Sequence, residues 1–270
     1  MPTVSLGDGD LYYEERGEGP PLLLVPGLSG LGSFWAFQVE AFSRDFRVVV
    51  HDHRGTGRST HSRIEYSVEQ MAADVLTLMD RLGIARAHFA GHSTGGAIGQ
   101  VLAQDQPERI ASLVLSATWA GQDAFFRRCF EVRKQVLLQS GVESYLRASV
   151  PFLAPGWWVS ANDAALEAQH RAQVAASPPV EILASRIDAI VRFDRRARLG
   201  KIAAPMLVVV AADDMLTPRF LLGGAGQRHS RRQAPCPLRG RSFRPRHRPG
   251  RVQRRGGGFP GRPPPSLGRA

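Results

Sequence analysis

Short apolar runs alternate with helix-like patterns along residues 1–222 of the chain. Most of these runs have the length of a strand and end at glycine, proline or aspartate, which is typical of strands joined by crossover helices. The alternation predicts an α/β fold with a mostly parallel sheet flanked by helices. Gly7-Asp8-Gly9 indicates a hairpin between the first two strands. The predicted strands are Val4 to Leu6, Leu11 to Glu15, Pro21 to Val25, Phe46 to His51, Ala87 to Ala90, Ile110 to Ser116 and Met206 to Ala211.

Two helices are predicted between these strands. One begins at Ser67, which forms a capping box with Gln70. Its apolar residues recur every three or four positions, and this pattern ends at Gly83. The other spans Thr94 to Gln104. The last strand, from Met206, is apolar throughout, which predicts burial on both faces.

Residues 119–200 carry no strand pattern and predict several helices. We expect breaks in these helices near Gly141, Pro151, Pro155-Gly156 and Pro178-Pro179. The segment has the position of an insertion between two strands, so we interpret it as a helical cap. The predicted domains are a core of residues 1–118 and 201–222, a cap of residues 119–200 and a tail of residues 223–270.

Charge sets the tail apart from the rest of the chain. The formal net charge is +11, from 35 basic and 24 acidic residues. Residues 223–270 contain 13 Arg, 10 Gly and 8 Pro and no Lys, Asp or Glu, so residues 1–222 hold 22 basic against 24 acidic residues, a net of −2. Such a tail cannot bury a core and is predicted to be disordered.

Cysteine usage and apolar run lengths predict a soluble cytoplasmic protein. Cys129 and Cys236 lie too far apart in the sequence to indicate a disulfide framework or a zinc site. The N-terminal residues show no signal-peptide pattern, and no apolar run has the length of a membrane span.

The run Gly91-His92-Ser93-Thr94-Gly95 is the strongest candidate for chemistry. It follows an apolar strand and opens a helix, which is the setting of a nucleophile elbow. In this reading Ser93 is the nucleophile, and the tight turn explains the glycines at both ends. The alternative reading is an ordinary turn between a strand and a helix.

Acyl transfer also requires oxyanion donors and an acid. The backbone N–H of Thr94 and that of Leu28, in the glycine-rich loop after the third predicted strand, are the candidate donors. Asp214, after the last predicted strand, is our choice of acid, and Asp213 is the alternative. The two aspartates could instead cap a helix.

These motifs resemble those of the α/β-hydrolase superfamily. The chain is similar to the branch that holds 3-oxoadipate enol-lactonases and the aminoacrylate hydrolases of pyrimidine breakdown. The resemblance covers about residues 4 to 220 and implies a small-molecule ester, lactone or amide-like substrate. It also implies Ser93 as nucleophile, Asp214 as acid and the Leu28 and Thr94 amides as oxyanion hole, with no cofactor or metal. The matching runs are Val25 to Leu28, Asp52 to Ser59, Gly91 to Gly95 and Asp214 to Pro218.

The resemblance also implies a catalytic histidine that this sequence does not supply at the expected place. In the family, a Gly-His step follows the acid by about 28 residues, a spacing that ends here at Ser242. His247 is the weak substitute in this reading frame. Codons chosen for the residues from Leu221 onward, read one base later, can encode a helix, a strand, a Gly-His step across Ser242-Phe243 and a final helix. We therefore hypothesise a frameshift near residue 220, with a disordered tail replacing the C-terminal part of the fold and with impaired activity.

Two other functions remain open from the sequence. The arginine-rich tail resembles disordered segments that bind nucleic acids, including Arg254-Arg255-Gly256-Gly257-Gly258-Phe259. A purpose-built tail would not replace the part of the fold that carries the histidine, which argues against this reading. The chain could also be a hydrolase-fold protein without catalysis, but the presence of Ser93 and Asp214 argues against an old loss of chemistry.

Overall fold

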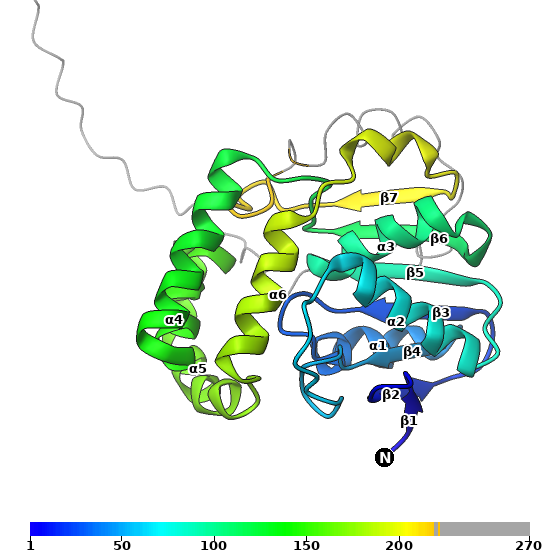
Figure 1. Ribbon diagram of the computed structural model, residues 1–270, viewed down its shortest axis with the longest axis horizontal. Coiled ribbons are helices and arrows are strands. Elements are labelled where there is room, and N and C mark those ends of the chain that lie inside the picture. The colour runs from blue at the N-terminus through cyan, green and yellow to red at the C-terminus, as the bar shows by residue number, and fades with distance from the viewer. Residues whose placement is uncertain (219–220, 222–270) are drawn as a thin grey trace, which may run out of the picture. The chain divides into compact units, whose positions relative to one another are not determined.

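The computed structural model describes residues 1–218 and 221 of the chain. These residues form one seven-stranded sheet in the order β1-β2-β4-β3-β5-β6-β7 (Figure 1). The first two strands pair antiparallel and β2 is antiparallel to β4, whereas the remaining pairs are parallel. The mostly parallel sheet predicted from the sequence is thereby confirmed. The strands are β1 Thr3–Ser5, β2 Asp10–Arg16, β3 Pro21–Val25, β4 Arg47–His51, β5 Ala87–His92, β6 Ile110–Ser116 and β7 Met206–Val209.

The opening hairpin forms as its turn residues predict. Leu6 N–H donates to the Gly9 carbonyl at 2.7 Å. Gly7 adopts a φ of +92°, which a residue with a Cβ rarely takes. Strands β3 and β6 have the predicted bounds, and β5 runs two residues further than predicted, to His92.

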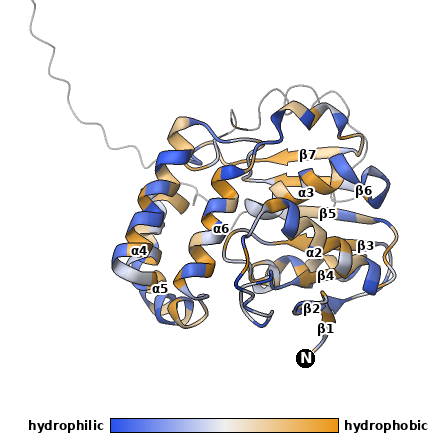
Figure 2. Ribbon diagram, viewed as in Figure 1, coloured by the Kyte–Doolittle hydropathy of each residue, from blue (hydrophilic) through white to orange (hydrophobic). Residues whose placement is uncertain are grey.

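The helices between the strands cover the sheet, and the hydrophobic core lies between these helices and the strands. Figure 2 shows the apolar residues concentrated in the strands and on the helix surfaces that face them. The largest cluster of buried side chains joins β3, α2, α3 and the segment after β6. The helices of the structure are α1 Ala36–Phe42, α2 Val68–Arg81, α3 Thr94–Asp105, α4 Ala124–Leu153, α5 Gly156–Ala175 and α6 Val180–Arg192, and the 3₁₀ helices are Gly32–Trp35, Pro107–Arg109 and Arg196–Lys201.

Helix α2 shows half of the predicted capping box. The Ser67 hydroxyl accepts the Gln70 backbone N–H at 3.0 Å, as predicted. The Gln70 side chain donates to Asp74 and does not return to Ser67. The buried Asp74 carboxylate takes the Gln70 Nε2 donor, and the Gln70 Oε1 that a capping box would use has no hydrogen-bond partner among the described residues.

Residues between β6 and β7 form the three helices α4, α5 and α6, as the lack of a strand pattern predicted. The expected break at Gly141 is confirmed by its non-helical backbone (φ 78°, ψ −178°) within α4. The prediction of a helix break at Pro151 was wrong, because α4 continues through this proline to Leu153. A proline near the end of a helix removes one hydrogen bond without forcing the chain to turn. The division into core and cap stays a prediction.

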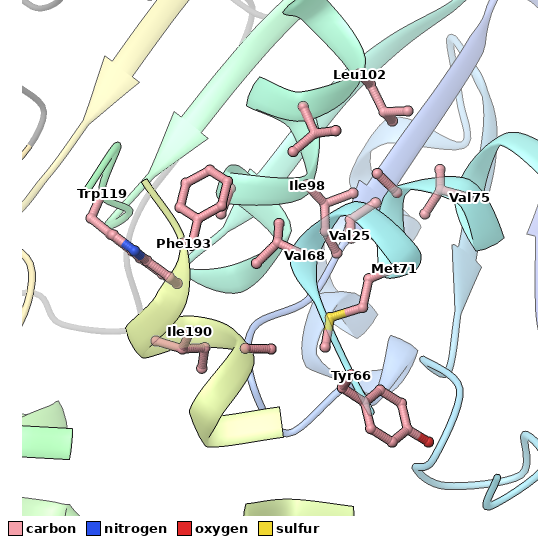
Figure 3. Close-up of a cluster of buried hydrophobic side chains, with 14 of the residues drawn as sticks. Val25, Tyr66, Val68, Met71, Val75, Ile98, Leu102, Trp119, Ile190 and Phe193 are labelled. Carbon is pink, nitrogen blue, oxygen red and sulfur yellow. The ribbon is translucent and has the colours of Figure 1, made fainter. Parts of the chain in front are cut away.

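Helices α4, α5 and α6 contact the core beside the sheet through the C-terminal end of α6. Phe193 lies edge-on to Trp119, with ring centroids 6.0 Å apart. Figure 3 shows Phe193 and Ile190 beside Trp119 and the core residue Val68. The segment therefore shares one buried cluster with the sheet.

The prediction for the last strand was wrong in two respects. Strand β7 ends at Val209, two residues before the predicted end, and it is only partly buried, with Leu207 44% exposed. In the described part of the sheet β7 is the edge strand, paired with β6 alone, so one of its sides lacks a neighbouring strand. The predictions for residues 223–270, including disorder, the frameshift and His247, lie outside the described residues.

Candidate active site

Ser93 occupies a sharp turn between β5 and α3. Its backbone has φ 52° and ψ −117°, and within the described residues Ala117 is the other non-glycine residue with a positive φ. Such a conformation is strained for a residue with a Cβ and persists only where its surroundings enforce it. Here the Ser93 N–H donates to the Ser116 carbonyl at 2.8 Å, and the Thr118 hydroxyl donates to the Ser93 carbonyl at 2.7 Å.

The glycines around the turn are required by close backbone contacts. A Cβ on Gly91 would collide with the carbonyl of Gly95. A Cβ on Gly95 would collide with the carbonyl of Val25 in β3. The pattern Gly-x-Ser-x-Gly thus allows helix α3 to begin directly against two strands, which supports the elbow reading over an ordinary turn.

The Ser93 side chain is available for chemistry. It is partly exposed and stands at the N-cap position of α3, yet it makes no capping hydrogen bond. Nothing in the part of the chain that the structure describes accepts or donates a hydrogen bond to its hydroxyl. A serine at this position commonly caps its helix, so its hydroxyl is left for a substrate or a base. The N-terminus of α3 favours negative charge beside it.

The predicted oxyanion loop lies against this turn. A Cβ placed on Gly27 would lie 3.2 Å from the Ser93 Cβ, so the Gly27 backbone reaches the elbow. The Gly30 N–H donates to the Gly27 carbonyl at 2.9 Å, which closes a turn centred on Leu28 and Ser29. The structure therefore brings the Leu28 turn, Ser93 and Thr94, the first residue of α3, into one place.

Asp214 follows β7 and forms a turn of its own. Its carboxylate accepts the Thr217 N–H at 2.7 Å and the Thr217 hydroxyl at 3.0 Å. This is the local capping geometry that the sequence left open as an alternative, although a carboxylate keeps further lone pairs for a third donor. The charge of Asp214 also acts on His92, whose pKa it raises against the larger effect of burial. Asp213 is exposed.

His92 packs against neighbouring side chains in the structure. Its ring stacks on Phe34, with centroids 4.7 Å apart, and its Nδ1 lies 3.3 Å from the Ser116 hydroxyl. Burial lowers the pKa of His92 to about 4, with Asp214 opposing the shift, so the imidazole is neutral at neutral pH. The other described histidines are His51, His53, His61, His88 and His170, and none of them has a hydrogen bond to Ser93 within the described residues.

A buried polar cluster behind the Leu28 turn was not predicted. Its centre is Arg186 of α6, which is fully buried and bonds to the carbonyls of Leu28 and Arg54. These contacts join segments more than 130 residues apart, which no local pattern reveals. One signal was present: Arg186 interrupts the apolar face of α6 between Ile182 and Ile190.

The described residues contain neither a candidate metal site nor a helix that could span a membrane. Within residues 1–218 and 221, no three His, Cys, Asp or Glu side chains are grouped so that they could hold a metal ion. No helix among the same residues is long and apolar enough to cross a membrane.

Comparison with known proteins assigns the family. The family model described as alpha/beta hydrolase fold matches residues 20–234 of the chain. The chain belongs to the α/β-hydrolase fold family. Accordingly, this α/β hydrolase is an enzyme, and its relatives indicate hydrolysis of small substrates.

Two of the sequence relatives carry the name "Putative carbamate hydrolase RutD". The protein from Azorhizobium caulinodans is 44% identical over 221 residues, which cover 82% of this α/β hydrolase and 83% of the relative. The protein from Caulobacter vibrioides is 43% identical over 222 residues, with 80% and 82% covered.

Solved structures of other hydrolases share the fold. The enol-lactonase from Burkholderia xenovorans LB400 is 30% identical, with a TM-score of 0.74 and coverage of 82% of this chain and 85% of that one. A thermophilic esterase from Thermogutta terrifontis is 25% identical, with a TM-score of 0.72 and 83% of each chain covered.

Proposed function

We propose that this α/β hydrolase cleaves small-molecule esters, lactones or amide-like bonds by nucleophilic attack of Ser93. The observation that carries the proposal is the strained Ser93 backbone at the end of β5, which leaves a partly exposed hydroxyl with no capping role. Strain of this kind is kept where a function requires it.

The neighbouring groups have the chemistry that such an attack needs. As Ser93 Oγ adds to a carbonyl carbon, the carbonyl oxygen becomes an anion. The backbone N–H groups of Thr94 and Leu28 are the proposed donors to this oxyanion, and the positive end of the α3 dipole stabilises the same charge. Asp214 is the proposed acid that orients the general base.

The base must come from beyond Asp214. In family order the histidine follows the acid, and His247 and the histidine of the shifted reading frame both satisfy this order. We propose that the frameshift removed the original base, so that the chain as written has little activity. Loss of the base from a triad can cost on the order of 10⁶ in kcat.

The names of relatives limit the substrate class. Proteins similar to this chain are named as a carbamate hydrolase and an enol-lactonase. A carbamate and an enol-lactone both contain a carbonyl carbon bonded to a heteroatom leaving group, which is the kind of centre that a serine nucleophile attacks. We propose an ester, lactone or amide-like substrate of this kind.

Two chains test the proposal: the 270-residue chain and a version with the frame restored from residue 221. Each is assayed with p-nitrophenyl acetate, an enol-lactone and an aminoacrylate, and the gene is sequenced across codon 220. We expect the restored chain to be faster by about 10⁴-fold or more. Ser93→Ala should abolish its activity. Ser33→Ala, an exposed serine on the adjacent 3₁₀ helix, should leave it unchanged.

Three results would contradict parts of the proposal. Ready, Ser93-dependent hydrolysis of p-nitrophenyl acetate by the 270-residue chain would show that its base is present. Full activity of the restored chain with Ser93→Ala would show that Ser93 is not the nucleophile. A gene whose codons do not encode the shifted terminus would disprove the frameshift.

A further inference from the structure

Arg186 projects from α6 into the interior of the sheet side of the molecule. Its residue is 0% exposed. One guanidinium nitrogen donates to the Arg54 carbonyl at 2.8 Å. The other terminal nitrogen contacts two acceptors, the Leu28 carbonyl at 3.1 Å and His53 Nδ1 at 3.0 Å.

The contact with Leu28 falls on the central peptide of the Gly27–Gly30 turn. The Gly30 N–H holds the carbonyl of Gly27, and this carbonyl belongs to the same planar peptide as the Leu28 N–H. Arg186 holds the next carbonyl along, that of Leu28. Between them, the two bonds fix the planes of both peptides that border Leu28, and thus the direction of its N–H.

The backbone around the Gly27–Gly30 turn leaves space for the Arg186 guanidinium. A Cβ on Gly30 would lie 3.0 Å from Arg186 Nη2, so glycine at this position leaves room for it. The Gly30 carbonyl in turn accepts the His53 N–H at 2.7 Å and the Thr56 hydroxyl at 3.2 Å. The turn and the loop after β4 therefore form one unit with Arg186 between them.

The charge of Arg186 has no carboxylate partner within the described residues. Its contacts are two carbonyls, an imidazole nitrogen and the face of Tyr66, whose ring centroid is 5.6 Å from the guanidinium carbon, and its Nε has no hydrogen-bond partner there. A buried cation with neutral partners is costly to the fold. A role of Arg186 in stability alone is therefore a weak explanation for its position.

We propose that Arg186 is the positioning residue of the oxyanion site. It holds the Leu28 turn in the orientation that serves Ser93, and its positive charge favours the anionic tetrahedral adduct formed there. This inference rests on the proposed function of Ser93. Arg186 does not touch the substrate and acts through the Leu28 peptide.

Arg186 stays protonated at neutral pH among its titratable neighbours. Burial lowers the pKa of Arg186 to about 10, and the nearby Tyr66, Asp74 and Tyr145 oppose the shift. Burial, together with the Arg186 charge, holds the pKa of His53 well below its usual value. His53 is thus a neutral acceptor through Nδ1, and Arg186 remains the cation of the cluster.

The test uses the full 270-residue chain and phenylboronic acid. The hydroxyl oxygen of Ser93 adds to boron and releases its proton to water, which leaves an anionic tetrahedral boronate bound to the oxygen. Formation of this adduct needs no turnover and is followed by ¹¹B NMR and by titration. Amide hydrogen exchange of residues 27–32 reports the order of the turn in the same samples.

Arg186→Met, which removes the charge and keeps the length, should weaken the adduct by about tenfold or more, since a direct oxyanion donor contributes about 10²–10³. It should also speed exchange at residues 27–32. Arg186→Lys should recover part of the affinity. The matched control is Arg192→Met on the same helix, which loses a bond to the Tyr66 carbonyl and should bind as the unaltered chain does.

The outcomes separate the two proposals. Unaltered binding by Arg186→Met, with binding lost in Ser93→Ala, overturns the role of Arg186 and leaves Ser93 in place. Equal losses in the Arg186→Met and Arg192→Met variants also overturn that role. Absence of a Ser93-dependent boronate in this chain overturns the role of Arg186, whereas the proposed function is decided separately by the Ser93 assays of the frame-restored chain. If Arg186→Met does not fold, the Arg186→Lys variant takes its place in the test. Faster amide exchange at residues 27–32 together with weaker boronate binding by this variant supports the role of Arg186. Exchange and binding equal to those of the unaltered chain reject that role.

Discussion

Three neutral histidines, the buried His51 and His53 and the partly buried His92, should make this protein sensitive to mild acid. Burial lowers the pKa of His51 to about 4, with Asp52 opposing and Arg186 reinforcing the shift. Burial also lowers the pKa of His92 to about 4, and that of His53 moves in the same direction. An unfolded chain protonates these side chains near the ordinary pKa of 6.5, so below this pH the unfolded state binds more protons than the folded state. Stability is therefore complete above about pH 7 and falls as the pH decreases toward 4.

The size of the effect follows from the two pKa values. For a histidine at 6.5 when unfolded and about 4 when folded, stability decreases by about 2 kcal/mol between about pH 7 and about pH 5. His92 contributes a similar amount, so the pair costs about 4 kcal/mol before His53 is included. Because domains are stable by only about 5–15 kcal/mol, we expect the protein to unfold near pH 5.

Urea unfolding followed by tryptophan fluorescence at several pH values measures this dependence. His51→Gln should reduce the decrease in the free energy of unfolding between about pH 7 and about pH 5 by about 2 kcal/mol. The exposed His61→Gln should leave it unchanged. A free energy of unfolding that is constant over this range, or a His51→Gln variant with the full dependence, would refute the reasoning.

Three further predictions concern the packing around the site. Gly95→Ala, which pushes a methyl group into the Val25 carbonyl, should destabilise the fold by about 1–3 kcal/mol, measured by thermal unfolding; a neutral result would mean that the elbow can relax. Asp74→Ala leaves the buried Arg54 without its buried carboxylate partner and should cost about 3–5 kcal/mol in urea unfolding; an unchanged stability would mean that the exposed Asp8 alone is sufficient for this arginine. Ser67→Ala removes the cap of α2 and should cost about 1 kcal/mol by the same assay, and an equal effect of Ser67→Thr would contradict the capping role.

Local chemistry was sufficient to predict most of the sheet. The hairpin follows from Gly7-Asp8-Gly9, the cap of α2 from Ser67, and the elbow from the glycines on either side of Ser93, because each depends on neighbours within a few residues. The prediction for β7 was wrong because burial of a strand depends on the strand beside it, which an apolar run does not specify. Arg186 was missed for the same reason, since its partners are set by the docking of α6.

The bond from Arg186 to the Leu28 carbonyl spans 158 residues of sequence. As a chain emerges from the ribosome N-terminus first, β3 and its following turn are made long before α6. The strands up to β6 can pair while this turn still lacks its guanidinium, because closing so long a loop comes late in folding. The Leu28 turn then receives its guanidinium only when α6 docks, so a nascent chain stalled before residue 180 would present a formed elbow beside a turn whose Leu28 carbonyl still lacks this donor.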